Sequence, residues 1–237
     1  MKLREFAPKW LRRSLRTRLK AKRAAQFRRE SIADSLEKTA AAVCDSRLEF
    51  CAGQRADEIA PFLHWAAETP LRRIAEIGSA RGGNLLLFSI AAESESQLIS
   101  IDLDDDPAKE AVYRRLIEPS HRLTFIAGDS HDPKTVDRFR ESLGGDMLDL
   151  LFIDGDHSYE GVKADFDRYS PFVRGGGIIG IHDIVPDAFQ RFGRATPSDT
   201  GGVFSFWNEL KANGLDWREF VSDPDQDGFG IGAIRRQ

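Results

Sequence analysis

The sequence has few cysteines. Only two of its 237 residues are cysteine, Cys44 and Cys51, which is too few for a disulfide framework. They lie seven residues apart in a segment predicted to be helical, where they would share one face and could not readily bond to each other. We therefore expect reduced thiols and a cytoplasmic protein.

Long hydrophobic runs are also missing. No apolar stretch reaches the roughly 20 residues that span a bilayer, and the N-terminus lacks the apolar core of a signal peptide. We expect neither a membrane-spanning helix nor a secretion signal. The hydrophobic content of 41% is nevertheless enough for a sizeable core. The length suits one large domain, or a domain of about 180 residues with an appendage.

Excess positive charge is confined to the start of the chain. Residues 1–30 hold twelve Lys and Arg against two Glu, a net charge of +10. The remaining 207 residues hold 22 basic and 36 acidic side chains, a net charge of −14. The chain is therefore predicted to be a basic arm joined to an acidic body.

The arm has apolar side chains at roughly helical intervals among its basic residues, namely Phe6, Trp10, Leu11, Leu15, Leu19 and Phe27. Such a helix could lie on an anionic membrane, at its inner face. It could equally pack on a partner protein, including a second copy of the chain, or form a disordered basic tail. The acidic body argues against nucleic acid, because it would repel the phosphates that the arm attracts.

From residue 70 onward, short apolar strands alternate with helices. Strands are predicted at 72–77, 97–101, 122–127, 148–153 and 177–181, and helices at 84–93, 107–118, 133–143 and 159–170. This alternation predicts an α/β fold, a doubly wound parallel sheet with helices on both faces. A helix at 203–213 and two strands at 216–223 and 228–236, joined by a hairpin-type turn, end the chain. We expect an N-terminal helical extension at 31–69 and one domain at 70–237.

The first predicted strand ends in a glycine-rich turn, IAEIGSARGGN at 74–84. Its glycines, Gly78, Gly82 and Gly83, allow a tight turn and let a ligand lie against the backbone. The dinucleotide fingerprint is not met, because Ala80 stands at its second glycine. Glu76 suits a cofactor with a cationic amino-acid end and suits pyrophosphate poorly. As structure alone, the segment is a generic strand-to-helix turn.

Acids also end the second and third predicted strands. Asp102 lies about 20 residues beyond the glycine turn, where an acid can accept two hydrogen bonds from the ribose diol of an NAD or an S-adenosyl cofactor. Asp129 can accept a hydrogen bond from the exocyclic amine of adenine. Asp132 precedes Pro133, and Asp104 to Asp106 precede Pro107, so we expect these acids to cap helices.

The densest polar cluster is FIDGDHSYEG at 152–161. Asp154, Asp156 and His157 follow the fourth strand, and His182 and Asp183 follow the fifth. The carboxyl ends of parallel strands meet at one sheet edge, where ligands bind. An acid from one strand and an acid with a histidine from the next can hold a divalent cation. A polar corner without function would not usually recur on adjacent strands, so we expect a site.

The runs EIGSARGGN, ISIDLD, AGDSHDP, IDGDHSYEGV and GGGIIGIHD resemble the class I S-adenosylmethionine-dependent methyltransferases. The narrower resemblance is to the small O-methyltransferase-type branch with the pattern IDGDHSYEGV…HD, over about residues 70–237. It implies a seven-stranded Rossmann-like sheet of order 3-2-1-4-5-7-6 with the last strand antiparallel. It also implies O-methylation of a sugar, glycan or natural-product acceptor, as in natural-product and polysaccharide biosynthesis. Among small-molecule acceptors, a sugar hydroxyl, a polyketide, a phenol and an amine all stay open. Together with the basic arm, this type of enzyme favours a lipid-linked glycan.

By position, the resemblance assigns the cofactor to Glu76, Gly78, Ser79, Gly82, Asn84, Asp102, Asp129, Ser130 and Asp154. If the chain resembles the metal-dependent members of this group, its Asp154, His182 and Asp183 stand at the metal-ligand positions and would hold Mg²⁺ or another divalent cation. The general base of these relatives lies three residues beyond the first metal carboxylate, a position that His157 occupies here. We expect His157 to accept the proton near pH 7 and Asp156 to orient either Asp154 or His157. His182 departs from the usual acid, so His182 could be the base instead.

Three other functions compete with this interpretation. An NAD-linked oxidoreductase is disfavoured by Ala80 and by the antiparallel strands at the end of the chain. A non-catalytic S-adenosylmethionine-binding assembly protein is disfavoured because Asp154, His157 and Asp183 are all present. A metal hydrolase is weakened by the cofactor-type acids on the first three strands.

Overall fold

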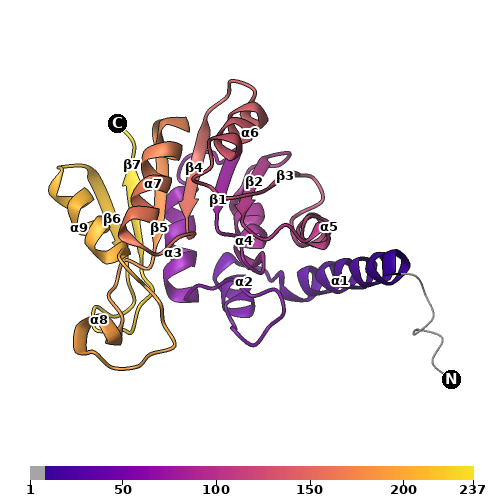
Figure 1. Cartoon of the computed structure of the whole chain (residues 1–237), viewed down its shortest axis with the longest axis horizontal. Coiled ribbons are helices and arrows are strands. Elements are labelled where there is room, and N and C mark those ends of the chain that lie inside the picture. The colour runs from indigo at the N-terminus through magenta and orange to yellow at the C-terminus, as the bar shows by residue number, and fades with distance from the viewer. Residues whose placement is uncertain (1–8) are drawn as a thin grey trace.

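The computed structural model describes residues 9–237, and its seven strands form one sheet of order β3-β2-β1-β4-β5-β7-β6 (Figure 1). The strands are β1 (Arg73–Ile77), β2 (Gln97–Asp102), β3 (Arg122–Ala127), β4 (Leu148–Ile153), β5 (Val173–His182), β6 (Asp216–Phe220) and β7 (Ile231–Arg235). The first five pair in parallel, and β7 runs antiparallel between β5 and β6. The predicted fold class, strand order and antiparallel last strand are confirmed.

Helices cover both faces of the sheet (Figure 1). They are α1 (Lys9–Ser31), α2 (Leu36–Val43), α3 (Ala56–Ala66), α4 (Gly83–Ala91), α5 (Pro107–Leu116), α6 (Pro133–Leu143), α7 (Tyr159–Tyr169), α8 (Ala188–Phe192) and α9 (Val203–Ala212). Successive residues of β4 point to opposite faces. Leu150 packs with α3, α4 and α5, and Leu151 packs with α6, α7 and α9. This two-sided burial explains why the strands are apolar throughout.

Helix starts follow the predicted caps. Asp106 accepts a hydrogen bond from the Ala108 amide at 3.0 Å and begins α5, and Asp132 accepts one from the Lys134 amide at 2.9 Å and begins α6. A proline follows each acid, where its missing N–H costs no hydrogen bond. Both capping predictions are confirmed.

Two local predictions are wrong. Residues 44–55 are not helical: Asp45 accepts from the Arg47 amide at 3.0 Å in a turn, so Cys44 only ends α2 and Cys51 lies in a coil. The link between β6 and β7 is not a tight hairpin turn but a loop over 221–230. The short helix α8 was not predicted, because five residues carry no readable periodicity.

Helix α1 packs along α5 and projects beyond the sheet (Figure 1). Ala24 is fully buried, the rings of Phe27 and Phe50 pack edge to face at 5.6 Å, and Arg28 donates to the Ile117 carbonyl at 2.7 Å. Leu15 and Leu19 remain about half exposed on the outer part of the helix. The first part of the predicted basic arm, residues 1–8, lies outside the described residues. None of the helices within 9–237 has the length and apolarity needed to cross a bilayer.

A buried acid on α3 fixes the 221–230 loop. Glu58 is fully buried, and its carboxylate accepts from the amides of Ser222 at 3.1 Å and Gly230 at 2.9 Å and from Gln226 Nε2 at 2.7 Å. Hydrogen bonds to a buried charge are stronger than neutral ones, and their donors have no water to replace a lost acceptor. Glu58 therefore provides most of the buried hydrogen bonds between α3 and this loop, and Arg55 adds an exposed one to the Ser222 hydroxyl at 3.4 Å.

We predict that Glu58→Ala lowers the free energy of unfolding by about 3 kcal/mol, because three donors lose their acceptor. Urea unfolding followed by circular dichroism measures the change. The control is Glu68→Ala, an exposed acid just after α3, for which we expect a loss of at most about 0.5 kcal/mol. Equal losses in the two variants would contradict the anchoring role of Glu58.

Candidate active site at the carboxyl edge of the sheet

The site forms where β1 and β4 end side by side. Ile77 pairs with Ile153, so Gly78 and Asp154 lie next to each other just beyond the strands. Gly78 has a φ of +85°, and a Cβ there would lie 1.9 Å from the carbonyl oxygen of Asp154. Only glycine fits this position without moving the backbone. The two strand ends can therefore approach closely at the switch point of the sheet, where ligands bind in α/β folds.

A cavity of about 660 Å³ opens at this edge, a size suited to a cofactor. It brings together most of the side chains predicted from the sequence. Those lining it are Gly78, Ser79, Asn84, Asp102, Asp129, Ser130, Asp154, Asp156, His157, His182 and Asp183. Glu76 and Gly82 do not line it.

Gly82 has a structural role at the start of α4. It begins α4 with a φ of +82°, and a Cβ there would lie 2.6 Å from the ring of Tyr113. The Tyr113 hydroxyl donates to the Ala80 carbonyl at 3.0 Å, and Ala80 itself has a φ of +39°. The glycine turn is thus shaped by packing on α5, and the contact of Gly82 with the cofactor stays a prediction.

Glu76 lies buried close behind the cavity wall. Its side chain is fully inaccessible, and within residues 9–237 neither carboxylate oxygen has a hydrogen-bond partner. Burial raises the pKa of Glu76 to about 8; Asn84 and Ser79 lie close enough to oppose this shift, but neither forms a hydrogen bond of good geometry with the carboxylate. An uncompensated buried acid is costly to the fold and is a candidate ligand for a cationic group.

The acids at the ends of β2 and β3 are held by neighbouring backbone amides and, for Asp102, by a lysine. Asp102 accepts from the Ala80 amide at 2.8 Å, and its other oxygen lies 2.7 Å from Lys109 Nζ. Asp129 accepts from the His131 amide at 2.8 Å. Both acids line the cavity at the positions that the resemblance assigns to ribose and adenine.

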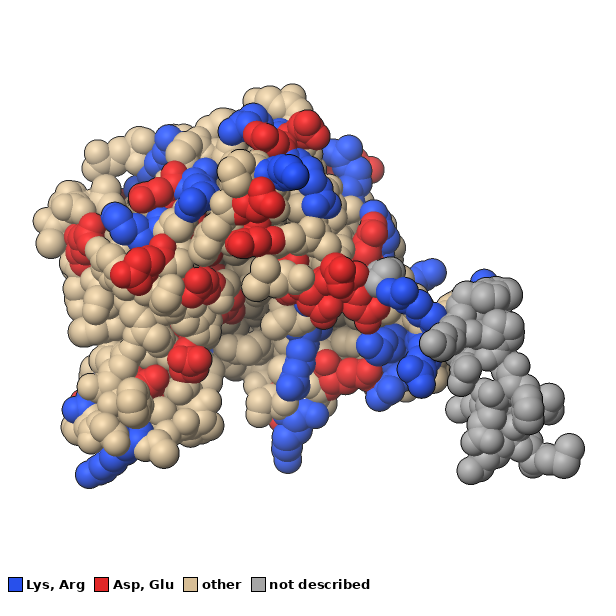
Figure 2. All heavy atoms as spheres, in the orientation of Figure 1, with Lys and Arg blue, Asp and Glu red and all other residues tan. Residues whose placement is uncertain are grey.

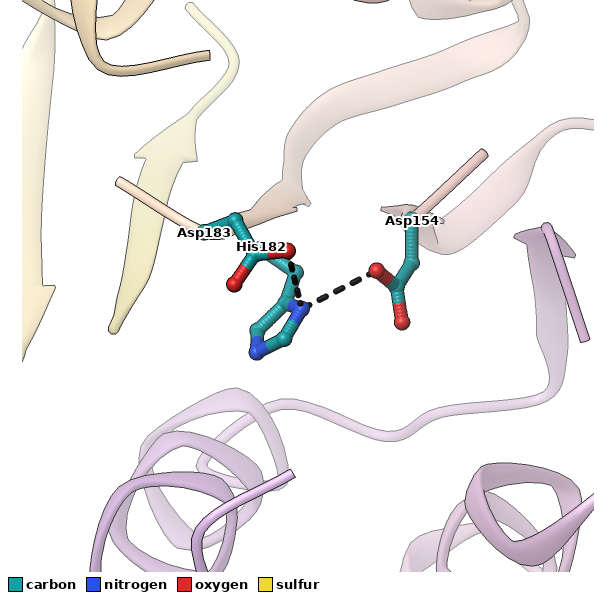
Figure 3. A group of neighbouring side chains, drawn as sticks. All are labelled: Asp154, His182 and Asp183. Atoms are coloured by element: carbon teal, nitrogen blue, oxygen red, sulfur yellow. Dashed lines mark hydrogen bonds and ion pairs between the residues drawn. The ribbon is translucent and has the colours of Figure 1, made fainter. Parts of the chain in front are cut away.

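Asp154, His182 and Asp183 converge from β4 and β5 (Figure 3). His182 Nδ1 lies 3.0 Å from an oxygen of Asp154 and 3.4 Å from one of Asp183. Asp183 has a φ of +63°, rare for a residue with a side chain, and also accepts from the Phe229 amide at 3.1 Å. Such strain concentrates at functional sites. Although burial opposes a charge on His182, the two carboxylates raise its pKa well above the ordinary value.

His157 bridges the same two carboxylates. Nε2 lies 3.7 Å from Asp154, Nδ1 lies 3.5 Å from Asp183, and Nδ1 also contacts the carbonyl of Asp199. The interaction with Asp154 raises the pKa of His157 to about 9, against the effect of burial. The imidazole therefore holds its proton at neutral pH, which differs from the expected base near pH 7. Asp156 accepts from the Ser158 amide at 2.8 Å and so shapes the entry to α7.

The residues fit a divalent cation. Ligand atoms of Asp154, His182 and Asp183 all lie within 4.8 Å of one another. Carboxylate oxygens suit Mg²⁺, and an imidazole nitrogen also suits transition metals. His182 Nδ1 lies between the carboxylates of Asp154 and Asp183, a position to which their negative charge would also attract a cation.

Several side chains at the site were not predicted. Gln54 Nε2 donates to Asp154 at 3.0 Å from the 44–55 coil, and Cys51 lines the cavity. No sequence pattern marked either residue. His131 also lines the cavity, 3.2 Å from the fully buried Asp165. Its position in AGDSHDP, directly after the third strand, could have predicted a place at the site.

Comparisons with known proteins agree on the kind of domain. Residues 75–184 match the family described as a methyltransferase domain. A protein of Sinorhizobium fredii, "Uncharacterized protein y4gI", is 26% identical over 170 residues, 68% of this chain and 17% of that protein. The mycinamicin VI 2''-O-methyltransferase of Micromonospora griseorubida is 28% identical over 116 residues, 47% of this chain and 29% of that enzyme. The matches thus span less than a third of the length of either relative.

Solved structures share the fold at low sequence identity. An O-methyltransferase from Bacillus cereus in complex with SAH has a TM-score of 0.56 at 17% identity, with 86% of this chain and 92% of that one covered. TomG from Streptomyces achromogenes, in complex with SAM, has a TM-score of 0.56 at 19% identity, with 87% and 92% covered. The narrower branch suggested by IDGDHSYEGV…HD stays a prediction. Residues 75–184 match a methyltransferase domain, and the chain shares its fold with solved O-methyltransferase structures that hold SAH or SAM.

Proposed function

We propose that the protein transfers a methyl group from S-adenosylmethionine to a hydroxyl of a sugar, glycan or natural product. Glu76 carries the proposal, because it is a buried acid without a hydrogen-bond partner in the described chain, close behind the glycine turn of the cavity. The cofactor brings a cationic amino group, which would supply the missing partner. In NAD the group expected at this glycine turn is the anionic pyrophosphate, which an acid would repel.

The acceptor class is supported by the relatives. One relative is named for methylation of a hydroxyl on mycinamicin VI, and the related MycE structure holds Mg, SAH and mycinamicin VI. MycE superimposes on 87% of this chain with a TM-score of 0.55 at 18% identity. A hydroxyl-bearing glycoside is therefore the first acceptor class to test.

The proposed reaction joins the methyl carbon to the acceptor oxygen and breaks its bond to the sulfonium sulfur, which keeps the electron pair. Most of the acceleration would come from alignment of the two reactants. The hydroxyl proton must leave, and His157 can take it only after losing its own proton, since its pKa is about 9. The carboxylates of Asp154 and Asp183 would stabilise the imidazolium that His157 becomes.

Asp154, His182 and Asp183 are the residues that would hold a divalent cation, which when bound would stabilise a developing alkoxide. His182 would have to give up its Nδ1 proton to act as a ligand.

The first prediction concerns ligand binding. We expect S-adenosylmethionine and S-adenosylhomocysteine to bind with micromolar affinity in calorimetric titrations, with and without Mg²⁺, and NAD not to bind. Adenosyl binding without methylation of any hydroxyl compound would favour the non-catalytic alternative. NAD binding in place of the adenosyl ligands would exclude the proposed function.

The second prediction concerns Glu76 and pH. The native state keeps the Glu76 proton up to about pH 8, whereas an unfolded glutamate loses it near pH 4.3. Unfolding therefore releases a proton between these values, and native stability falls as pH rises through them. We expect Glu76→Gln to remove this loss and to gain roughly 1–3 kcal/mol over the wild type at pH 8, with little gain at pH 4.

The same substitution should weaken S-adenosylhomocysteine binding at least about ten-fold, because the cationic amino group loses its acid. Thermal unfolding at several pH values and calorimetry measure the two effects. Glu141→Gln, at an exposed position, is the control and should change neither. A Glu76→Gln variant that binds like the wild type would remove the observation on which the proposal rests.

We also propose that α1 brings the protein to an anionic lipid surface, which would suit a lipid-linked acceptor. Figure 2 shows Lys and Arg gathered over α1. Lys20 and Arg23 pair with acids of the body, whereas Arg13, Arg16 and Arg18 are exposed around the half-exposed Leu15 and Leu19. A basic helix with solvent-facing leucines is typical of interfacial binding.

We predict that the protein co-sediments with vesicles containing phosphatidylglycerol but not with neutral vesicles, and that added salt releases it. Leu15→Ser/Leu19→Ser keeps every charge and should weaken binding about ten-fold. Met147→Ser, an exposed apolar position far from α1 in the fold, is the control. Unchanged binding of the double variant would contradict the role of the two leucines, and no vesicle binding by the wild type would overturn the lipid proposal for α1.

A further inference from the structure

Residues 184–202, here called the α8 strap, begin and end at the candidate active site. The strap leaves β5 directly after His182 and Asp183. At its far end the Asp199 carbonyl contacts His157 Nδ1, and the Gly202 amide donates to the His157 carbonyl at 2.6 Å. The strap is therefore joined to residues of both β4 and β5 that carry the proposed chemistry.

The far end of the strap lies directly on the backbone of the site. Gly201 has a φ of +49°, and a Cβ there would lie 2.1 Å from the His157 carbonyl oxygen. At Gly202 a Cβ would lie 2.4 Å from the Tyr159 amide nitrogen. Because no side chain separates the two segments, the position of the strap and the position of His157 depend on each other.

The strap is also braced internally. Asp187 is buried and accepts from the amides of Gln190 at 2.9 Å and Thr200 at 3.2 Å. Asp227 of the 221–230 loop accepts from the Ala188 amide at 2.6 Å. Figure 2 shows this region as a lobe at lower left that joins the body above it, with a hollow between the lobe and the lower central part of the molecule. The strap is thus a defined surface beside the site.

This braced surface exposes two aromatic rings. Phe189 and Phe192 are each 65% exposed, and their spacing of three residues puts them on the same side of α8. Arg194 lies over the Phe192 ring, 5.4 Å from its centroid, whereas no aromatic or cationic side chain of residues 9–237 stacks on Phe189. Paired large apolar side chains held at the surface by a hydrogen-bonded support mark a binding surface.

Charge limits what can bind there. The strap holds two acids and two arginines, and the 221–230 loop that supports it adds three acids and no base, giving the lobe a net charge of −3. The ends of β1, β2 and β3 are assigned to the cofactor, so the acceptor must approach from the side of β4 and β5, next to this lobe. A phosphorylated acceptor would be repelled there.

We propose that the α8 strap binds the acceptor through Phe189 and Phe192, and that the acceptor is an uncharged or cationic glycoside whose apolar aglycone lies on these two rings. This inference rests on the proposed function and narrows its acceptor class. A free sugar lacks the apolar surface, and a sugar phosphate carries the wrong charge.

The test uses the full chain loaded with S-adenosylhomocysteine and three kinds of probe. These are neutral glycosides with an aromatic aglycone (a set of 4-methylumbelliferyl glycosides), the matching methyl glycosides, and glucose 1-phosphate. Binding is followed by saturation-transfer NMR and calorimetry. We expect only the aromatic glycosides to bind, and Phe189→Ser/Phe192→Ser to weaken them roughly ten-fold or more while S-adenosylhomocysteine binds as in the wild type.

Phe189→Leu/Phe192→Leu keeps an apolar surface and should retain most of the affinity. Trp217→Ser, an exposed aromatic on β6, is the control and should retain all of it. The inference is overturned if the wild type prefers the phosphate or the methyl glycosides, binds no aromatic glycoside, or binds it equally after the double substitution. The inference is also overturned if Phe189→Ser/Phe192→Ser loses binding to phosphatidylglycerol vesicles but still binds the aromatic glycosides. Failure of S-adenosylhomocysteine to bind would instead remove the proposed function.

Discussion

Gly78 and Asp154 meet where β1 and β4 end side by side, and the rest of the site depends on this contact. The backbones approach so closely that a Cβ on residue 78 would overlap the Asp154 carbonyl. Parallel pairing of β1 with β4 sets the register, and the absent side chain lets the strand ends close. The glycine turn, the acid of β4 and the histidine–acid pair of β5 then face one cavity.

The electrostatics of the cavity divide into two halves. On the side of β4 and β5, the carboxylates of Asp154 and Asp183 are balanced by His157 and His182, whose pKa values are raised accordingly. On the side of β1, Glu76 has no such partner and keeps its proton to about pH 8. On the β4 and β5 side, the protein's own histidines therefore balance its carboxylates. On the β1 side no cationic group of residues 9–237 pairs with Glu76, which is why we propose that the cationic end of the cofactor lies there.

Segments distant in sequence complete the site. Gln54 reaches Asp154 from the coil before α3, and Glu58 on α3 holds the loop whose Phe229 amide binds Asp183. The α8 strap returns to His157 through Asp199 and Gly202. Strain at Asp183 persists because these surrounding contacts fix its backbone. Stability of the outer loops and geometry of the site are therefore linked through a few buried polar side chains.

The sequence by itself determined the alternation of strands and helices, the helix caps at Asp106 and Asp132, and the polar residues at strand ends. These features are local, because burial on two faces makes strands continuously apolar and a cap needs only its own first turn. The parallel edge then brings Asp102, Asp129, Asp154 and Asp183 together wherever such strands pair.

Tertiary structure alone decided what those residues contact. Gly82 resembled a ligand-binding glycine, yet its missing side chain makes room for Tyr113, which is far away in the chain. His157 resembled a base near pH 7, yet two carboxylates from different strands keep it protonated. Gln54 carried no signal at all, because its role depends on a coil folding back onto β4. Local patterns fix element types and exposed chemistry, whereas pKa values, close packing and long-range hydrogen bonds arise only from the neighbours that the fold supplies.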